Sequence, residues 1–342
     1  IDPGLIGDVV TGCVTQVGEQ GANVGRLGVL LSRLPKEVPA VSLNRMCGSS
    51  QQAVHFAAQA IAAGDVDFAI AGGVESMTRV PMFSDIGGGS HTLNPELGKR
   101  YELVHQGESA ERIAERYGFC REELDEWGYL SHKRAARATE EGRFSAQILP
   151  LEGLDAEGRP FLLTRDEGVR PDVDYEKMLA LKPVFRENGV VTAGNSSQIS
   201  DGAAALLLGD REKALALGLR PRARFLARVV VAGDPTLQLL EVIPAAKKAL
   251  ERAGLSLRDV DVIEVNEAFA SVVLAFLREL GADPEKVNPN GGAIAHGHPL
   301  GATGAVLMTK LLYELERTGG EFGLQVMCIG HGQATATVIQ RL

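Results

Sequence analysis

Cys47 stands between a strand-like stretch, Ala40–Leu43, and a helix-like run, Gln51–Ala63. This spacing predicts a thiol on the first turn of a helix, where free N–H groups and the positive end of the dipole favour the thiolate. The thiolate is the nucleophilic form of cysteine, and the small residues Gly48–Ser50 leave room for an acyl group beside it. A cysteine at a strand–helix turn can equally be buried and unreactive, so this position alone leaves both interpretations open.

Three further polar residues follow apolar stretches in the second half of the chain. Asn266 can donate to a developing oxyanion, or it can cap the helix that follows. His296 lies in the glycine-rich run Gly291–Gly304, where it can act as a general base or be a turn histidine bonded to backbone. Cys328 can be a second acid and base with the Gly330 N–H beside an oxyanion, or another buried cysteine.

Other candidates are interpreted as structural. His298 stands beside Pro299 in a turn, Cys13 continues a strand, and Cys120 lies in a charged segment. The His-x-His pattern of the glycine-rich run permits metal binding, but no carboxylate or cysteine stands at ligand spacing from it. We therefore expect no metal site.

Composition excludes several classes of function. The 342 residues carry a net charge of −9 without a long basic run, so a broad cationic surface for nucleic acid is not expected. The four cysteines are far apart, which favours a reducing, cytoplasmic setting over a disulfide framework. Neither a signal peptide nor an apolar run of about 20 residues is present, so we expect no membrane partner.

Forty glycines and many short runs of Val, Ile and Ala predict an α/β fold with buried strands. We expect strands at Asp8–Cys13, Ala40–Leu43, Asp67–Ala71, Ala204–Leu208, Ala223–Val231, Val262–Val265 and Leu324–Cys328. We expect helices at Gln51–Ala63, Ser109–Tyr117, Arg121–Glu141, Ile243–Ala253, Ala268–Leu280 and Thr303–Thr318. The stretch from about Thr78 to Ser197 is richer in charge and indicates an inserted, partly helical segment.

The parts of the chain on either side of this insert are weakly alike. The similar pairs are Asp8–Gly12 with Asp261–Val265, Val41–Ser49 with Val287–Gly297, and Ile70–Gly73 with Val326–Gly330. Their spacings agree roughly, which favours a duplicated fold.

Taken together, these segments resemble the thiolase family, whose members condense or cleave acyl-CoA thioesters. The motifs that carry the likeness, in family order, are Asn44–Ser50, Ala71–Met77, Asn195–Ala204, Asn266–Ala270, Gly291–Gly304 and Cys328–Gly330. The resemblance implies a duplicated thiolase fold, with two similar βαβαβαββ-type halves layered α-β-α-β-α and an inserted loop domain. The expected parts are an N-terminal half (1–78 plus 198–218), a CoA-binding loop domain (79–197) and a C-terminal half (219–342). The family's first strand and helix have no counterpart in this chain.

The resemblance also implies roles for the candidate residues. Cys47 resembles the nucleophile that carries the acyl group, and His296 resembles the base that activates it. Cys328 resembles the acid and base that removes and returns the α proton of the second acyl-CoA. Asn266 resembles the residue that holds an oxyanion-hole water, and the N–H groups of Cys47 and Gly330 resemble a second oxyanion hole.

Coenzyme A and acyl-CoA are expected as substrates, and no permanently bound cofactor is implied. Arg170 and Ser197 match positions that contact the CoA nucleotide and pantetheine. The implied activity is that of an acyl-CoA C-acyltransferase, which cleaves 3-ketoacyl-CoA by thiolysis or runs the reverse condensation. Transfer through a cysteine thioester implies ping-pong kinetics.

Some positions depart from the family pattern. Gln106 and Gln238 stand where short-chain biosynthetic members have methionines lining the acyl pocket, and His331 stands where glycine is usual. The segment after Met77 is short compared with the tetrameric members, which favours a homodimer over a tetramer. A related condensing enzyme is disfavoured by Cys328, and a catalytically weak scaffold subunit is disfavoured because the candidate catalytic residues are retained.

Overall fold

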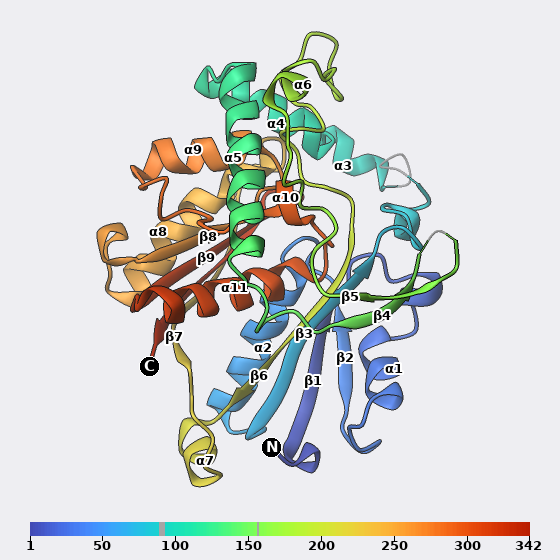
Figure 1. Ribbon diagram of the computed structural model, residues 1–342, viewed down its shortest axis with the longest axis vertical. Helices are drawn as coiled ribbons and strands as arrows, with labels where there is room; N and C mark the ends of the chain where they lie inside the picture. Colours follow the sequence, from blue (N-terminus) through green and yellow to red (C-terminus); the bar gives the residue numbers. More distant parts are fainter. Residues whose placement is uncertain (89–92, 156) are drawn as a thin grey trace.

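The computed structural model describes residues 1–88, 93–155 and 157–342 of the chain. Two four-stranded sheets form its framework, with strand orders β2-β1-β3-β6 and β7-β10-β9-β8 (Figure 1). The strands are β1 (Ile6–Gly12), β2 (Ala40–Leu43), β3 (Phe68–Ser76), β4 (Leu151–Leu154), β5 (Pro160–Leu163), β6 (Asp201–Gly209), β7 (Ala223–Ala232), β8 (Val262–Val265), β9 (Phe322–Ile329) and β10 (Gln333–Arg341). The predicted α/β class is confirmed.

The helices connect and cover these strands. They are α1 (Val24–Leu31), α2 (Ser49–Ala63), α3 (Pro95–Arg100), α4 (Gln106–Tyr117), α5 (Arg121–Glu140), α6 (Tyr175–Leu179), α7 (Arg211–Ala216), α8 (Val242–Ala253), α9 (Ala270–Leu280), α10 (Ala293–His296) and α11 (Thr303–Thr318). Among the described residues, none of the helices is long and apolar enough to cross a bilayer.

The two sheets share one plan. In the first, β1 pairs in parallel with β2 and β3, and β3 pairs antiparallel with β6. In the second, β8 pairs in parallel with β9, and β9 pairs antiparallel with β10. A parallel bridge between Ile263 and Val287 stands where β2 pairs with β1. The correspondence of β1 with β8 and of β3 with β9 is the one that the weak sequence likeness indicated, so the predicted duplication is confirmed.

Helices α2 and α11 lie between the sheets and complete the layered core. Helix α2 packs on β1, β3 and β6, while α11 packs on α2 and on strands of both sheets. Helix α1 covers the outer face of the first sheet, and α8 covers the outer face of the second. The central helices approach closely because Gly304 has no side chain, and a Cβ there would lie 2.4 Å from the Gln51 backbone nitrogen.

Polar side chains of α2 attach it to the second sheet. Gln51 donates to Thr337 Oγ1 at 2.6 Å and accepts from Thr335 Oγ1 at 2.7 Å, and His55 Nε2 lies 2.7 Å from Thr337 Oγ1. Burial lowers the pKa of His55 to about 3, with Arg228 and Arg45 adding to the effect. His55 is therefore a neutral, hydrogen-bonded core residue.

The segment between β3 and β6 leaves the first sheet and carries α3 to α6 and the β4–β5 hairpin. Helices α3, α4 and α6 lie at one end of the molecule, whereas the hairpin lies lower, at the level of the first sheet (Figure 1). Helices α4 and α5 pack against α9, and α5 also packs against α10. The Glu111 carboxylate accepts from the Val190 and Val191 N–H groups, both at 2.9 Å, which fastens the end of the segment to α4.

The lowered pKa of His55 predicts that its burial costs stability in acid. An unfolded histidine, with a pKa of about 6.5, binds a proton that the folded one excludes, so stability is full above that pH and falls below it. By pH 5 this histidine accounts for at most about 2 kcal/mol of lost unfolding free energy. The unfolding free energy is measured in urea at pH 7 and at pH 5. In His55→Gln the difference between the two values is smaller by up to that amount, whereas His331→Gln, at an exposed position, leaves it unchanged. An unchanged pH dependence in His55→Gln would contradict this assignment.

Candidate active site

Cys47 lies in the tight turn that joins β2 to α2. Met46 has a φ of 45°, a left-handed conformation that is costly for a side chain of this kind. The turn is held by side chains: Asn44 Oδ1 accepts from the Met46 N–H at 2.7 Å, and Ser49 Oγ accepts from the Arg45 N–H at 2.9 Å. These hydrogen bonds hold the strained turn, which places Cys47 directly before the start of α2, where Gly48 is the N-cap.

Gly48 brings this turn against the end of β9. A Cβ on Gly48 would lie 2.3 Å from Ile329 Cδ1, so a larger residue would push the turn away. The apolar cluster around Cys47 includes Met327 and Ile329, which flank Cys328 in the chain. The turn and the strand end predicted separately from the sequence thus meet in one site.

The environment of Cys47 keeps its thiol protonated. Burial raises the pKa of Cys47 to about 12, and the neighbouring Cys328 thiol raises it further, against hydrogen bonds from the Gln106 side chain and from the backbone N–H groups of Cys47 and Gly330. The side chain is 3% exposed. The donors expected at the helix start are present, but desolvation outweighs their effect on the pKa of the thiol.

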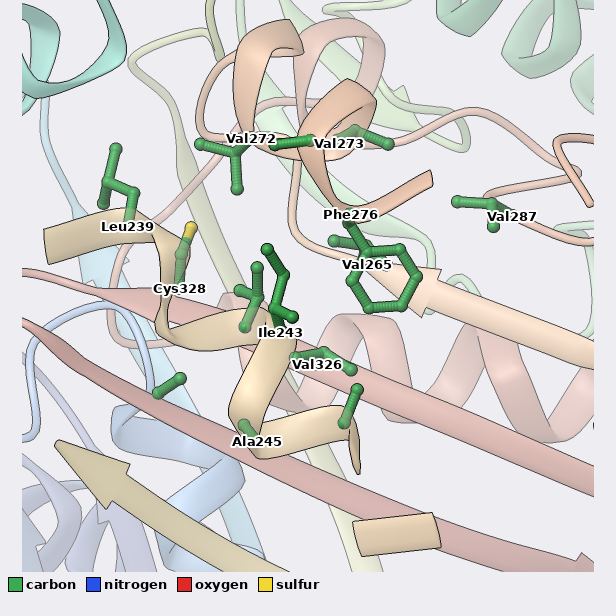
Figure 2. Close-up of a cluster of buried hydrophobic side chains, with 14 of the residues drawn as sticks. Leu239, Ile243, Ala245, Val265, Val272, Val273, Phe276, Val287, Val326 and Cys328 are labelled. Atoms are coloured by element: carbon green, nitrogen blue, oxygen red, sulfur yellow. The ribbon is translucent and has the colours of Figure 1, made fainter. Parts of the chain in front are cut away.

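Cys328 and Asn266 meet at the ends of β9 and β8. Asn266 Nδ2 lies 3.7 Å from Cys328 Sγ, and both residues are fully buried. Burial raises the pKa of Cys328 to about 11, although the Asn266 side chain and the Ala268 N–H lower it. Figure 2 shows the Cys328 side chain among the apolar residues that include Leu239 and Ile243. Asn266 Oδ1 is buried and has no hydrogen-bond partner among the described residues, so an acceptor faces the site.

The histidine of this cluster is His298. Its Nε2 lies 3.4 Å from Asn266 Nδ2, and its Nδ1 lies 2.7 Å from Thr303 Oγ1, which in turn bonds to the Pro299 carbonyl at 3.2 Å. An amide nitrogen only donates, so Nε2 accepts and the ring proton lies on Nδ1. Burial lowers the pKa of His298 to about 4. The ring is thus a neutral imidazole with a basic nitrogen beside Asn266.

His296, predicted as the base, lies elsewhere. Its Nε2 is 2.9 Å from the Asn290 carbonyl, its Nδ1 is 3.2 Å from Asp166 Oδ2, and its ring meets Phe144 edge to face. Gly297, with a φ of 95°, turns the chain after α10, so the two histidines have different neighbours. The structure therefore separates His296 from the cysteine cluster and places beside Asn266 the ring of His298, which we interpreted as structural. The His-x-His spacing drew attention to both, but alternation alone does not decide which ring enters the site.

Gly330 lies beside both cysteines, where other side chains converge. A Cβ on it would be 2.8 Å from Gln106 Nε2 and 2.8 Å from Met46 Sδ, so a larger residue would displace these two side chains. The Gln238 side chain is bonded to the backbone instead of to Cys47: its amide donates to the Val104 carbonyl and accepts from the His331 N–H. Gln106 is therefore the glutamine whose amide reaches the Cys47 sulfur.

His331 and the two predicted CoA contacts occupy more peripheral positions. His331 is exposed and has a φ of 58°, a conformation that favours glycine. The Ser197 N–H donates to the Ala268 carbonyl at 3.0 Å, which places Ser197 beside the segment after Asn266. Arg170 is an exposed residue of the insert, and its N–H donates to His132 Nδ1 at 3.3 Å. The part of the chain that the structure describes contains no group of acidic, His or Cys side chains able to hold a metal.

The site thus combines two buried thiols, an amide and a neutral imidazole at the strand ends of a duplicated α/β fold. Comparison with known protein families shows where this combination belongs. The sequence matches the thiolase N-terminal domain over residues 1–212 and the thiolase C-terminal domain over residues 219–341. The chain therefore belongs to the thiolase family, a class of acyltransferases, and the predicted duplicated thiolase fold is confirmed.

Relatives and a solved structure agree with this membership. The chain is 46% identical to a steroid 3-ketoacyl-CoA thiolase of Mycobacterium tuberculosis and spans 84% of that protein. It is also 46% identical to a 3-ketoacyl-CoA thiolase of Aliivibrio fischeri and spans 88% of it; both matches include all of this chain. The crystal structure of the Bacillus anthracis acetyl-CoA acetyltransferase matches with a TM-score of 0.90 and 36% identity, over 100% of this chain and 89% of that one.

The bond from Gln106 predicts a measurable effect on the Cys47 thiol. In Gln106→Met the pKa of the thiol rises, because a donor to the developing thiolate is lost. Alkylation of Cys47 by iodoacetamide near neutral pH, followed by peptide mass spectrometry, slows about three- to tenfold. The matched variant Gln238→Met changes the rate much less. Equal rates in Gln106→Met and the wild type would exclude this bond.

Proposed function

We propose that this thiolase is an acyl-CoA C-acyltransferase that carries the acyl group on Cys47, cleaving 3-ketoacyl-CoA by thiolysis or forming it by the reverse condensation. The observation that carries the proposal is the buried cluster in which Asn266 bonds to both His298 and Cys328 beside Cys47. Its support includes relatives named 3-ketoacyl-CoA thiolase and acetyl-CoA acetyltransferase.

The first half-reaction needs a base, because Cys47 is protonated at rest. His298 Nε2 accepts the thiol proton as the sulfur attacks the keto carbonyl of 3-ketoacyl-CoA, forming an S–C bond and an oxyanion. The carbon–carbon bond then breaks, and the electron pair leaves with the acetyl-CoA fragment as a carbanion. Cys328 supplies its proton to this carbon. In the condensation direction the same thiol, as thiolate, removes the proton.

The second half-reaction returns the enzyme to its starting state. The sulfur of free CoA attacks the acyl-enzyme carbonyl as the Cys328 thiolate takes the CoA thiol proton. The bond between the Cys47 sulfur and the acyl group then breaks, a new acyl-CoA leaves, and the Cys47 thiolate takes back its proton from His298. Two sets of donors can stabilise the oxyanions. The N–H groups of Cys47 and Gly330 serve the acyl group on Cys47, while Asn266 and the His298 Nε2–H, formed when that nitrogen takes the Cys47 proton, serve the thioester of the second substrate. The unpartnered Asn266 Oδ1 supports a water held there, as the family resemblance implies.

We assign CoA binding to the insert. In this division residues 79–197 form the loop domain, residues 1–78 with 198–218 form the N-terminal half, and residues 219–342 form the C-terminal half. The exposed Arg170 faces outward for a charged nucleotide, while Ser197 lies close to the catalytic segment for the pantetheine. CoA enters and leaves as a substrate.

The proposed assembly is a homodimer in the cytoplasm. Strand β2 is an edge of the first sheet, and its Val41 is 45% exposed, so the edge can pair with a second copy. The nearby helix α1 also exposes Leu27, Leu30 and Leu31. All four cysteines are free, which supports a reducing compartment.

The proposed activity predicts acylation of Cys47. The protein is incubated with acetyl-CoA, or with a panel of 3-ketoacyl-CoAs plus free CoA, and its peptides are analysed by mass spectrometry. We expect an acyl adduct on the Cys47 peptide that free CoA removes. If no thioester acylates Cys47, the enzyme proposal is rejected and a scaffold role is favoured.

The assignment of the base predicts a large effect at His298. In His298→Asn we expect the rate of Cys47 acylation to fall at least about a hundredfold, because the thiol loses its general base. Stopped-flow measurement of thiolysis gives the rate, with His331→Asn as the control on an exposed imidazole. A loss below tenfold in His298→Asn would assign the base to another residue.

The second thiol predicts a separation of the two half-reactions. Cys328→Ala still becomes acylated at Cys47 by acetyl-CoA, but condensation falls at least about a hundredfold because the α proton is no longer removed. Adduct mass and product chromatography on the same sample measure both steps. Condensation at the wild-type rate would refute the role given to Cys328.

A further inference from the structure

His296 holds a short segment of the insert against the catalytic half. Its Nε2 bonds to the Asn290 carbonyl at 2.9 Å and its Nδ1 to Asp166 Oδ2 at 3.2 Å. The carbonyl and the carboxylate are both hydrogen-bond acceptors, so His296 joins the loop before α10 to the insert through its two ring nitrogens. The His296 side chain is 7% exposed while that of Asp166 is 46% exposed, so the pair lies where the insert meets α10.

The Asn290 end of this contact is rigid. The Asn290 amide donates to Glu314 Oε2 at 2.8 Å and accepts from Arg143 at 2.8 Å, and the Lys310 ammonium donates to the Gly291 carbonyl. The loop that His296 grips is therefore anchored to α11.

Two more side chains fasten the segment 166–170 to the same region. The Gln198 amide donates to the Gly168 carbonyl at 3.0 Å and to the Ile294 and Ala295 carbonyls at 2.8 and 2.9 Å. The Gln198 carbonyl also accepts from the His298 N–H at 3.0 Å, which links the segment to the catalytic histidine loop. At the other end, the Arg170 N–H donates to His132.

The opposite side of the segment offers less support. Asp166 borders a cavity of about 1280 Å³ in the insert, lined also by Lys133 and Arg137 of α5, by Phe144 and by Arg165. The position of the segment therefore depends on its bonds to α10 and α5. Two charged groups act on the pair: Lys310 favours the Asp166 carboxylate, and Glu264 interacts with His296. His132 is also nearby, and burial lowers its pKa to about 4.

We propose that His296 is a positioning residue for coenzyme A: its hydrogen bond with Asp166 clamps the segment 166–170 to α10 and so places Arg170 for the CoA nucleotide. The inference rests on the proposed function, which supplies CoA as the substrate. His296 has no contact with Cys328 or Asn266 among the described bonds, so the clamp acts on binding rather than on the chemical steps.

The test separates KM from kcat. In His296→Asn and in Asp166→Asn we expect the KM for CoA in thiolysis to rise about tenfold, with kcat within about twofold of the wild type. The double variant raises KM no further than either single change, because both remove the same bond. Arg159→Gln, which breaks the exposed Arg159–Asp155 pair of the same insert, is the matched control.

Calorimetric titration with CoA measures the same effect without turnover. A tenfold weaker affinity in both single variants supports the clamp. If the wild type is active and both variants keep its KM and its affinity for CoA, the clamp is overturned and the proposed function stands. A fall in kcat equal to that of His298→Asn would instead make His296 part of the chemistry. If the wild type binds CoA but no thioester acylates it, the proposed function is contradicted and the clamp is not.

Discussion

Desolvation of the two thiols is the constraint on which the site depends. Burial raises the pKa of Cys47 to about 12 and that of Cys328 to about 11, so neither is a free-standing nucleophile or base near neutral pH. The same burial lowers the pKa of His298 to about 4 and keeps its ring neutral. A neutral thiol beside a neutral imidazole stores the proton until a substrate carbonyl arrives, and donors that face the developing charge then favour ionisation.

Close backbone contact between the halves builds this environment. A Cβ on Gly73 would lie 2.1 Å from the Gly301 carbonyl oxygen, so the first sheet touches the loop that follows His298. The buried Glu75 carboxylate accepts from the Gly301 N–H at 2.8 Å and from the Thr15 N–H at 3.0 Å, which joins the two halves at the same place. The duplication therefore positions Cys47 from one half beside Cys328 from the other, where Asn266 contacts both Cys328 and His298.

The sequence allowed much of the framework to be predicted, but fewer of the contacts. Helix α11 and strand β8 have the predicted bounds, because a periodic apolar pattern ending at Gly319 marks the helix and a short run rich in Val and Ile marks the strand. Strand β10 was not predicted, since its alternating Ala and Thr residues carry a weak signal and its partners β7 and β9 supply the pairing. His298 was passed over for His296 because the turn at Gly297 and the burial that distinguish the two rings are properties of the folded chain.

The protonation state of the resting site is the central claim, and ultraviolet absorbance of the thiolate measures it most directly. The account predicts that at about pH 7 the wild type and Cys47→Ala have the same thiolate absorbance, and that Cys47 ionises only in strong alkali. Thiolate absorbance at about pH 7 that is present in the wild type and lost in Cys47→Ala would contradict it. That result would mean a preformed thiolate–imidazolium pair in place of a neutral thiol and imidazole.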